Sequence, residues 1–292
     1  MGNGRIKKTA ILLSTALLVT SCSGGNTAVE ELSADTAFYT YPVGNAVTFD
    51  VSGDGTVYTI ESENGDLLCS YTLSGERSEI AELPQKTDSI AFSDGRIYYT
   101  QTVDDGTEIC YIDVSTADSE KLCVLSGLWQ IKNLDIAGGN AYIIGSDDTR
   151  SGVQGEFSDQ FGTYSYNGEM LYRVSLENGE ATASPVEFPQ AFCADEQGVT
   201  VYAADADGYY FTDFDGSRKQ YNDIGNLTAL EKCGDKLMFY SDTKIFKLCS
   251  GSENSEDGIA EALENVIMLS GNDLRYCGGY GFVLNRYGEF NG

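Results

Sequence analysis

Short apolar runs, in which hydrophobic and polar positions often alternate, follow one another from residue 46 almost to the end of the chain. Such runs, bounded by Gly and Asp, predict β-strands joined by tight turns, because glycine accepts the positive φ that hairpins need. One strand is predicted to follow each turn, and its six copies begin near Val57, Ile97, Ala141, Val201, Leu237 and Leu274. These residues lie 40, 44, 60, 36 and 37 positions apart, which indicates an internal repeat.

Each copy continues with a second apolar run, for example 68–71 and 109–112, and a weaker one, for example 78–81 and 121–124. Long amphipathic helical periodicity is absent, apart from one candidate turn at 259–264. Four short strands in about 40 residues is the period of a β-propeller blade. We therefore expect an all-β fold, a β-propeller of six four-stranded blades, near residues 46–84, 85–127, 128–189, 190–225, 226–264 and 265–292.

The two ends of this repeat leave alternatives open. The sixth unit has three clear strands before Gly292, so seven blades or a truncated chain is the alternative to six. An extra strand is predicted at 37–41, just before Pro42. Pairing of this strand into the last blade would close the ring and remove its open edge.

The first 21 residues have the pattern of a signal peptide. Arg5, Lys7 and Lys8 form a basic segment, and a short apolar run at 11–19 follows, too short to span a bilayer. Small residues then precede Cys22 directly. This junction resembles the lipobox of bacterial lipoproteins, whose cysteine is lipidated and becomes the mature N-terminus.

With its repeat, the chain resembles bacterial β-propeller lipoproteins. The resemblance implies a signal peptide at 1–21, a lipidated tether at 22–36 that starts at Cys22, and a propeller domain at 37–292. It implies attachment to the cell membrane through a lipid, such as palmitate, on the extracytoplasmic side. The chain also looks like the propeller part of larger lipoproteins in which a solute-binding domain follows.

Charge and histidine content exclude several classes of function. The leader holds three of the 18 Lys and Arg residues and none of the 45 Asp and Glu residues, so the mature chain carries a formal charge of −30. Such a charge repels phosphate backbones and argues against nucleic-acid binding. The chain contains no histidine, which excludes Ser-His-Asp and Cys-His catalysis and His-ligated zinc. We expect no metal and no cofactor.

Seven cysteines follow Cys22, and none forms a Cys-x-x-Cys pair. Cys69 and Cys110 recur at one position of the repeat, so they belong to different copies. Buried free thiols are the favoured interpretation, with one or more disulfides as the alternative.

The 60-residue step marks an insertion in the third unit, near 146–168, between its second and third strands. Aromatic residues beside carboxylates could stack on a sugar ring and hydrogen-bond its hydroxyls. The alternative is a long loop whose aromatic residues only cover the scaffold. Trp129, the single tryptophan, is expected to pack at the start of the third unit or to be exposed for stacking. The candidate ligand-binding residues are Trp129, Phe157, Phe161, Tyr164 and Tyr166.

Two acidic segments, 205–208 and 213–216, resemble calcium loops but lack the first ligand position, so hairpin turns explain them better. We expect a monomeric, non-catalytic binding or interaction module at the cell envelope, with an envelope protein or glycan as its partner. One alternative is the propeller region of a solute-binding lipoprotein in ABC-type transport. Another is a glycan hydrolase or lyase that uses carboxylates, since suitable carboxylate pairs could arise among 45 acidic residues.

Overall fold

The fold is described from a computed structural model of the whole chain, in which two compact units, 1–35 and 36–292, are distinguished. The described residues run from 46 to 283, with gaps at 63–65, 73–75, 84–86, 88, 105, 128, 147–154, 160–161, 167, 223–226, 228, 234–235, 242–243, 249–260, 263–273 and 278–279. The leader, Cys22 and the predicted strand at 37–41 lie outside them.

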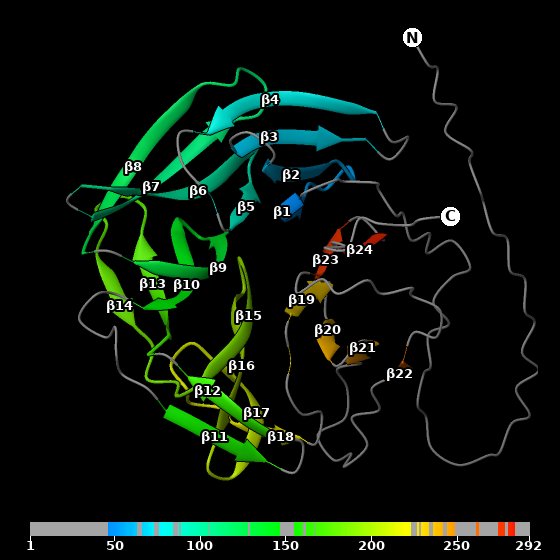
Figure 1. Cartoon of the computed structure of the whole chain (residues 1–292). Coiled ribbons are helices and arrows are strands. Elements are labelled where there is room, and N and C mark those ends of the chain that lie inside the picture. Colours follow the sequence, from blue (N-terminus) through cyan, green and yellow to red (C-terminus); the bar gives the residue numbers. More distant parts are fainter. Residues whose placement is uncertain are drawn as a thin grey trace, which may run out of the picture. The chain divides into compact units, whose positions relative to one another are not determined.

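Antiparallel sheets account for all of the secondary structure in the described residues (Figure 1). Sheet 1 has the strand order β1 (Ala46–Val51), β2 (Val57–Ser62), β3 (Asp66–Tyr71) and β4 (Arg77–Leu83). Sheet 2 has the order β5 (Ile90–Ser93), β6 (Arg96–Val103), β7 (Gly106–Asp113) and β8 (Ser119–Ser126). Sheet 3 has the order β9 (Gln130–Ala137), β10 (Asn140–Ser146), β13 (Met170–Ser175) and β14 (Ala181–Ala183).

The remaining sheets continue the pattern. Sheet 4 contains β15 (Pro189–Asp195), β16 (Gly198–Asp205), β17 (Gly208–Asp213) and β18 (Gln220–Asn222). Sheet 5 contains β19 (Ala229–Cys233), β20 (Lys236–Ser241), β21 (Lys244–Leu248) and β22 (Glu261–Ala262). Sheet 6 shows two described strands, β23 (Leu274–Cys277) and β24 (Tyr280–Val283). A separate hairpin, β11 (Gly155–Asp159) and β12 (Gly162–Tyr166), interrupts sheet 3.

The prediction of an all-β propeller with repeated four-stranded units is confirmed. The predicted second strands coincide with β2, β6, β10, β16 and β20, and the unit boundaries agree to within a few residues. One boundary is wrong by a residue, because β15 already begins at Pro189. In the described part of the chain, Gly55 and Gly95 have the positive φ expected of such turns, 83° and 75°.

The sheets follow one another around a ring, with contacts between neighbours near their first strands (Figure 1). β1 contacts β5, β5 contacts β9, and β9 contacts β15. The series continues from β15 to β19 and from β19 to β23, and β23 contacts β1. This radial order is that of a β-propeller. The number of blades stays a prediction, since sheet 6 has two described strands.

The core lies between the faces of neighbouring sheets. Between sheets 1 and 2, Ile60, Leu68, Ile90 and Ile97 are completely inaccessible to solvent. Similar clusters fill the spaces between sheets 2 and 3 and between sheets 3 and 4. Burial of each such side chain contributes about 2–3 kcal/mol. Stability therefore comes mainly from the interfaces between sheets.

Two aspartates reinforce these interfaces at equivalent positions of the repeat. Asp50 in β1 pairs with Tyr58, as Asp135 in β9 pairs with Tyr142. The Asp50 carboxylate accepts the Phe92 N–H of β5 at 2.6 Å, and the Asp135 carboxylate accepts the Ala194 N–H of β15 at 2.8 Å. Each carboxylate thus links its own sheet to the next one by a hydrogen bond to a main-chain amide.

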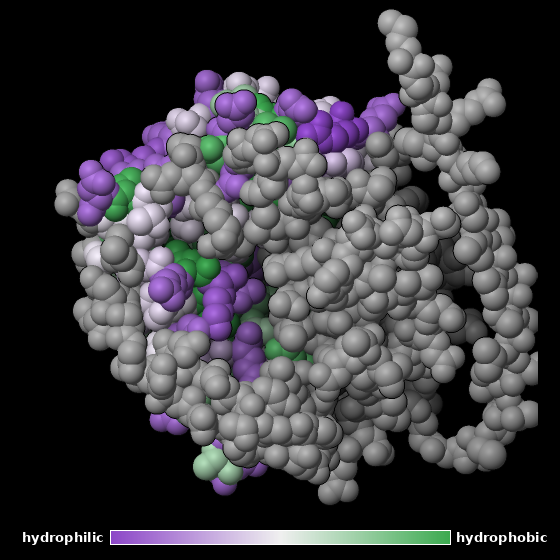
Figure 2. Space-filling view, in the orientation of Figure 1, coloured by the Kyte–Doolittle hydropathy of each residue, from purple (hydrophilic) through white to green (hydrophobic). Residues whose placement is uncertain are grey.

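The described surface is mostly polar, and Figure 2 shows one face on which hydrophilic residues predominate where residues are coloured. Val124 and Tyr221 are the large hydrophobic residues that are clearly exposed among those described. No helix long and apolar enough to cross a membrane occurs in the described part of the chain. A large apolar docking patch is therefore not seen on the described residues.

Candidate functional site

The predicted insertion in the third unit forms the hairpin β11–β12, between β10 and β13 of sheet 3. Phe157 and Tyr164 stand directly opposite each other in the register of this hairpin, and Tyr166 stands opposite Gly155. Phe161 lies outside the described residues. The hairpin thus brings two of the predicted binding residues to one cross-strand position.

Trp129 lies immediately before β9, at the start of sheet 3. Its indole meets the ring of Tyr172 edge-on, with a centroid distance of 4.6 Å and an interplanar angle of 74°. The main-chain N–H of Trp129 donates to the Thr107 hydroxyl at 3.0 Å. The expected packing of Trp129 at the start of the third unit is confirmed.

Four cysteines have described side chains, and all four are buried free thiols: Cys69, Cys110, Cys123 and Cys193. The favoured interpretation is confirmed for these four. Burial is the largest cause that raises their pKa values, to about 11 for Cys69 and for Cys110. The thiols remain protonated near neutral pH, so they are poor nucleophiles.

The two segments that resembled calcium loops form hairpin turns. The Asp205 carboxylate accepts the Asp207 N–H at 2.9 Å, and the Asp213 carboxylate accepts the Ser217 N–H at the same distance. Asp205 is further engaged by Lys219 at 2.6 Å. Among the residues with described placement, no group of three or more Cys, Asp or Glu could hold a metal ion.

One position of the repeat differs between sheets in a way that shapes the surface. It lies four residues after the start point of the second strand, and we call it position +4. Register confirms the equivalence, because Val57 pairs with Tyr71, Ile97 with Ile112, Ala141 with Val174, and Val201 with Thr212. Position +4 is occupied by Glu61, Gln101, Gly145 and Asp205 in sheets 1 to 4.

In sheet 1, a cation on the outer strand β4 covers this position. Arg77 donates to Glu61 at 2.9 Å, to Glu79 at 2.8 Å and to the Cys69 sulfur at 3.1 Å. The Tyr71 hydroxyl also donates to Glu61. Burial raises the pKa of Glu61, but the hydrogen bonds from Arg77 and Tyr71 outweigh it, so the net pKa is lowered.

Sheet 4 shows the same arrangement with different residues. Lys219, next to β18, donates to Asp205 at 2.6 Å, and Tyr221 donates to the same carboxylate at 2.9 Å. The Lys219 ammonium also lies 4.5 Å from the centroid of the Tyr210 ring, a cation–π contact. A basic side chain therefore fills the groove at position +4 here too.

Sheet 3 closes the groove by packing. A Cβ added at Gly145 would lie 2.5 Å from the main-chain oxygen of Gln130 in β9, so position +4 holds no side chain. The residues of β14 are small, with Ala181 opposite Val174 and Ala183 opposite Tyr172. Trp129 covers Tyr172 instead.

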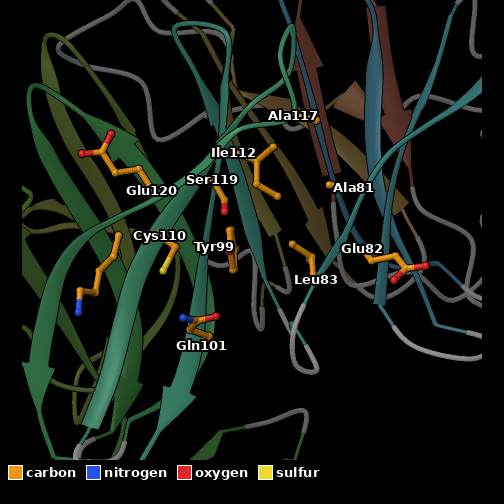
Figure 3. A pocket seen from close by; sticks show the side chains of 11 residues that line it. Ala81, Glu82, Leu83, Tyr99, Gln101, Cys110, Ile112, Ala117, Ser119 and Glu120 are labelled. Atoms are coloured by element: carbon orange, nitrogen blue, oxygen red, sulfur yellow. The ribbon is translucent and has the colours of Figure 1, made fainter.

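Sheet 2 leaves a cleft of about 540 Å³ at its position +4, between residues 81–83 of β4 and the face of β6, β7 and β8 (Figure 3). Ser119 stands opposite Ile112, as Arg77 stands opposite Tyr71 in sheet 1, so the side chain at this place is too short to cross the groove. In Figure 3, Ser119, Tyr99 and Gln101 lie one below another, beside Leu83.

The side chains of Tyr99, Gln101 and Cys110, which line this cleft, are uncharged near neutral pH. Gln101 donates through Nε2 to Glu108 at 2.7 Å, and Glu108 also accepts from Lys121 at 3.1 Å. The Gln101 Oε1 atom is buried and has no hydrogen-bond partner among the described residues. Burial raises the pKa of Tyr99 to about 12 and that of Cys110 to about 11. The cleft can therefore bind polar groups, but its hydroxyl and thiol are unsuited to act as base or nucleophile at neutral pH.

Sequence reasoning missed the cleft residues Tyr99, Gln101 and Ser119. One signal was available: Cys69 and Cys110 already aligned in the repeat, and the same alignment sets Glu61 against Gln101. To align Arg77 with Ser119 as well, the register between the third and fourth strands is needed. A β-bulge beside each of these cysteines shifts that register.

Neither the protein-family models nor the curated proteins contain a match to this sequence. Among solved structures, a structural genomics protein of unknown function from Bacteroides thetaiotaomicron matches with a TM-score of 0.51 and 11% identity, over 81% of this chain and 65% of that chain. A chain of the nidogen/laminin complex gives a TM-score of 0.49 at 12% identity, over 71% of this chain and 76% of its own.

TolB from Acinetobacter baumannii gives a TM-score of 0.47 at 12% identity, over 69% of this chain and 51% of TolB. This chain therefore spans about half the length of TolB and about two thirds of the Bacteroides protein. At such low identities the likeness concerns the fold alone.

Proposed function

We propose that this protein is a lipid-anchored β-propeller on the extracytoplasmic side of the cell membrane, where it binds an envelope protein or glycan without catalysing a reaction. The anchor is proposed from the leader and from the small residues that precede Cys22. The lipid on this cysteine would hold the domain beside the bilayer.

The observation that carries the binding role is the hairpin β11–β12. It is an addition to sheet 3 that its four-stranded order does not require, because β10 pairs directly with β13. A rigid repeat with an inserted hairpin is a common way to present binding residues. Phe157 and Tyr164 share one cross-strand position on this hairpin, which suits them to a common contact surface.

Two further observations favour a binding module over an enzyme. The sequence contains no histidine, the usual base near neutral pH. The phenol and thiol in the cleft of sheet 2 have raised pKa values and remain protonated. Both properties suit recognition by shape and neutral hydrogen bonds.

The binding role is tested by deletion of residues 147–166 from the full chain, purified in detergent. Fragmented envelope glycan and envelope protein extract serve as probes in separate pull-downs. We expect the deletion to abolish retention of one of the two probes and to leave the melting temperature of the propeller unchanged, because sheet 3 is complete without the hairpin. The variant Phe157→Ala/Tyr164→Ala should reproduce the loss.

A matched control is Val124→Ala, a change at an exposed apolar residue in sheet 2. It should retain the probe as the unaltered protein does. Equal retention by the deletion variant and the unaltered protein would contradict the hairpin as the binding element. Release of a modified glycan from the probe would contradict the non-catalytic role.

The anchor is tested separately by detergent phase partition. The unaltered chain should enter the detergent phase and incorporate a labelled fatty acid, whereas Cys22→Ala should do neither. Fatty-acid incorporation into Cys22→Ala would contradict lipidation at this residue.

A further inference from the structure

The cleft of sheet 2 occupies a place that the chain fills with its own side chains in the three other sheets compared above. In sheets 1 and 4 the filling group is a cation, Arg77 or Lys219, held by an acceptor at position +4. In sheet 3 it is Trp129, packed on Tyr172. In sheet 2 the residue that corresponds to Arg77 is Ser119, which is too short to reach across.

The acceptor at position +4 is nevertheless retained in sheet 2. Because Gln101 uses its Nε2 to donate to Glu108, its Oε1 points away from that carboxylate. This oxygen is buried at the cleft without a hydrogen-bond partner among the described residues. A buried acceptor left unpaired is costly, so a donor that reaches it from outside gains free energy.

Charge around the cleft favours a cationic donor. Glu82 and Glu120 line it from its two sides, while Lys121, the basic residue of the lining, is held by Glu108. In Figure 3 the carboxylates of Glu82 and Glu120 point outward, so they attract through the field and not by direct contact. The acidic mature chain adds to this attraction.

Size and shape are also suitable. A volume of about 540 Å³ lies within the usual range of small-molecule sites, about 300–1,000 Å³. Leu83 and Ile112 supply apolar walls, and Tyr99 supplies an aromatic one. A planar guanidinium can stack on such a ring while its N–H groups donate to an amide oxygen.

We propose that the cleft between β4 and sheet 2 binds the guanidinium group of a small ligand or of an arginine side chain, with Gln101 Oε1 as the acceptor. The bound group takes the place that the Arg77 guanidinium takes in sheet 1. This site is separate from the hairpin β11–β12, so an experiment can contradict the guanidinium site without contradicting the binding role of the hairpin.

The test compares two probes that differ in one group, L-argininamide and L-citrullinamide, by calorimetry with the full chain in detergent. The two have nearly the same shape, but citrullinamide carries a neutral ureido group. We expect L-argininamide to bind at least about tenfold more tightly, since charged hydrogen bonds are the stronger ones. Equal binding of the two probes, or no binding of L-argininamide at millimolar concentration, would overturn the proposal.

Location is tested by moving the filling group of sheet 1 into sheet 2. The variant Ser119→Arg is designed to fill the cleft with an arginine that donates to Gln101 Oε1, and it should lose binding while it melts at or above the original temperature. The single variant Gln101→Leu removes the acceptor and should weaken binding at least about tenfold. Asp205→Asn in sheet 4 is the matched control and should bind L-argininamide normally. Undiminished binding by folded Ser119→Arg, or by Gln101→Leu, would place the site elsewhere.

Discussion

Sheets 1 and 2 have the same strand order and neighbouring places in the ring, yet position +4 is covered by a side chain in sheet 1 and lines a cleft in sheet 2. In sheet 1, Glu61 is covered by Arg77 from the outer strand. In sheet 2, Gln101 faces a cleft because Ser119 stands in the place of Arg77. A repeated sheet leaves the same groove in every copy, and each copy needs side chains of its own to close it. A binding site can therefore arise where one copy omits the closing side chain.

Sheets 3 and 4 extend this comparison. In sheet 4, Asp205 and Lys219 form an ion pair at position +4, as Glu61 and Arg77 do in sheet 1. Sheet 3 has Gly145 at position +4, and Trp129 covers Tyr172, so apolar packing closes the groove there. The mechanism of closure thus varies from sheet to sheet, although the groove is the same. Variants of these closing groups are expected to change the free energy of unfolding, from the largest effect to the smallest.

Trp129→Ala should cause the largest loss, because it removes the ring that covers Tyr172 in sheet 3. We expect the free energy of unfolding to fall by about 3 kcal/mol, the lower end for aromatic truncation, since the indole is half-buried. Urea denaturation measures this change. Trp129→Phe keeps a ring in place and should lose less. A loss within about 0.5 kcal/mol, typical of surface changes, would contradict the closing role.

Gly145→Ala should come next. The new Cβ would meet the Gln130 main-chain oxygen at 2.5 Å, so β9 and β10 must separate. We expect a loss of about 2 kcal/mol in the free energy of unfolding. Gly53→Ala is the matched control, because nothing lies within 4 Å of its Cβ position. Similar losses for both glycines would show that the contact at Gly145 is not responsible.

Arg77→Ser copies the residue of sheet 2 into sheet 1. It removes the charged hydrogen bonds from Arg77 to Glu61 and Glu79, and we expect a loss of about 1–2 kcal/mol, since Arg77 is partly exposed. The reference variant is Ser119→Ala in sheet 2, which should stay within about 0.5 kcal/mol of the unaltered protein. If Arg77→Ser is equally harmless, the ion pair does not close the groove of sheet 1.

The smallest effect is expected on the pH dependence of stability. Burial raises the pKa of Glu61 and of Asp205, but hydrogen bonds chiefly from Arg77 and Lys219 outweigh it, so both net values lie below the ordinary 4.5 and 3.8. Because these pKa values are lowered in the folded state, the stabilisation is complete above the ordinary values. It is lost as the pH falls through the lowered ones.

The double variant Glu61→Gln/Asp205→Asn should therefore lose less free energy of unfolding between neutral pH and about pH 3 than the unaltered protein. Urea denaturation at a series of pH values measures the difference. Val124→Ala in sheet 2, a change at an exposed apolar residue, should keep the original pH profile, because neither side chain titrates. An unchanged acid profile in the double variant would contradict the ionic closure of sheets 1 and 4.

The strands and the insertion were predictable because their signals are local. Alternating apolar residues and Asp-Gly turns fix the strands near Val57 and Ile97, and the long step to Val201 reveals the hairpin. The cleft was not predictable in the same way. It depends on which side chain of β8 stands opposite Ile112, and a bulge shifts that register.

In sequence, the change from Glu61 to Gln101 resembles an ordinary surface substitution. Its meaning appears with the second change, from Arg77 to Ser119, on a strand that is not adjacent to it. Trp129 is the intermediate case: its packing was predicted from its place before a strand, but its partner Tyr172 lies 43 residues later, beyond the inserted hairpin. Partners on non-adjacent strands of one sheet, such as these, follow from the assembled fold.

The most direct test of the account is a crystal structure of the full chain soaked with L-argininamide. The account predicts the guanidinium in the cleft of sheet 2, with an N–H donated to Gln101 Oε1 and the plane of the group against Tyr99. In the variant Ser119→Arg, the new arginine should occupy the same place. A structure in which Lys121 or another side chain of the protein crosses the cleft and covers Gln101 would contradict the claim that sheet 2 is the copy left open.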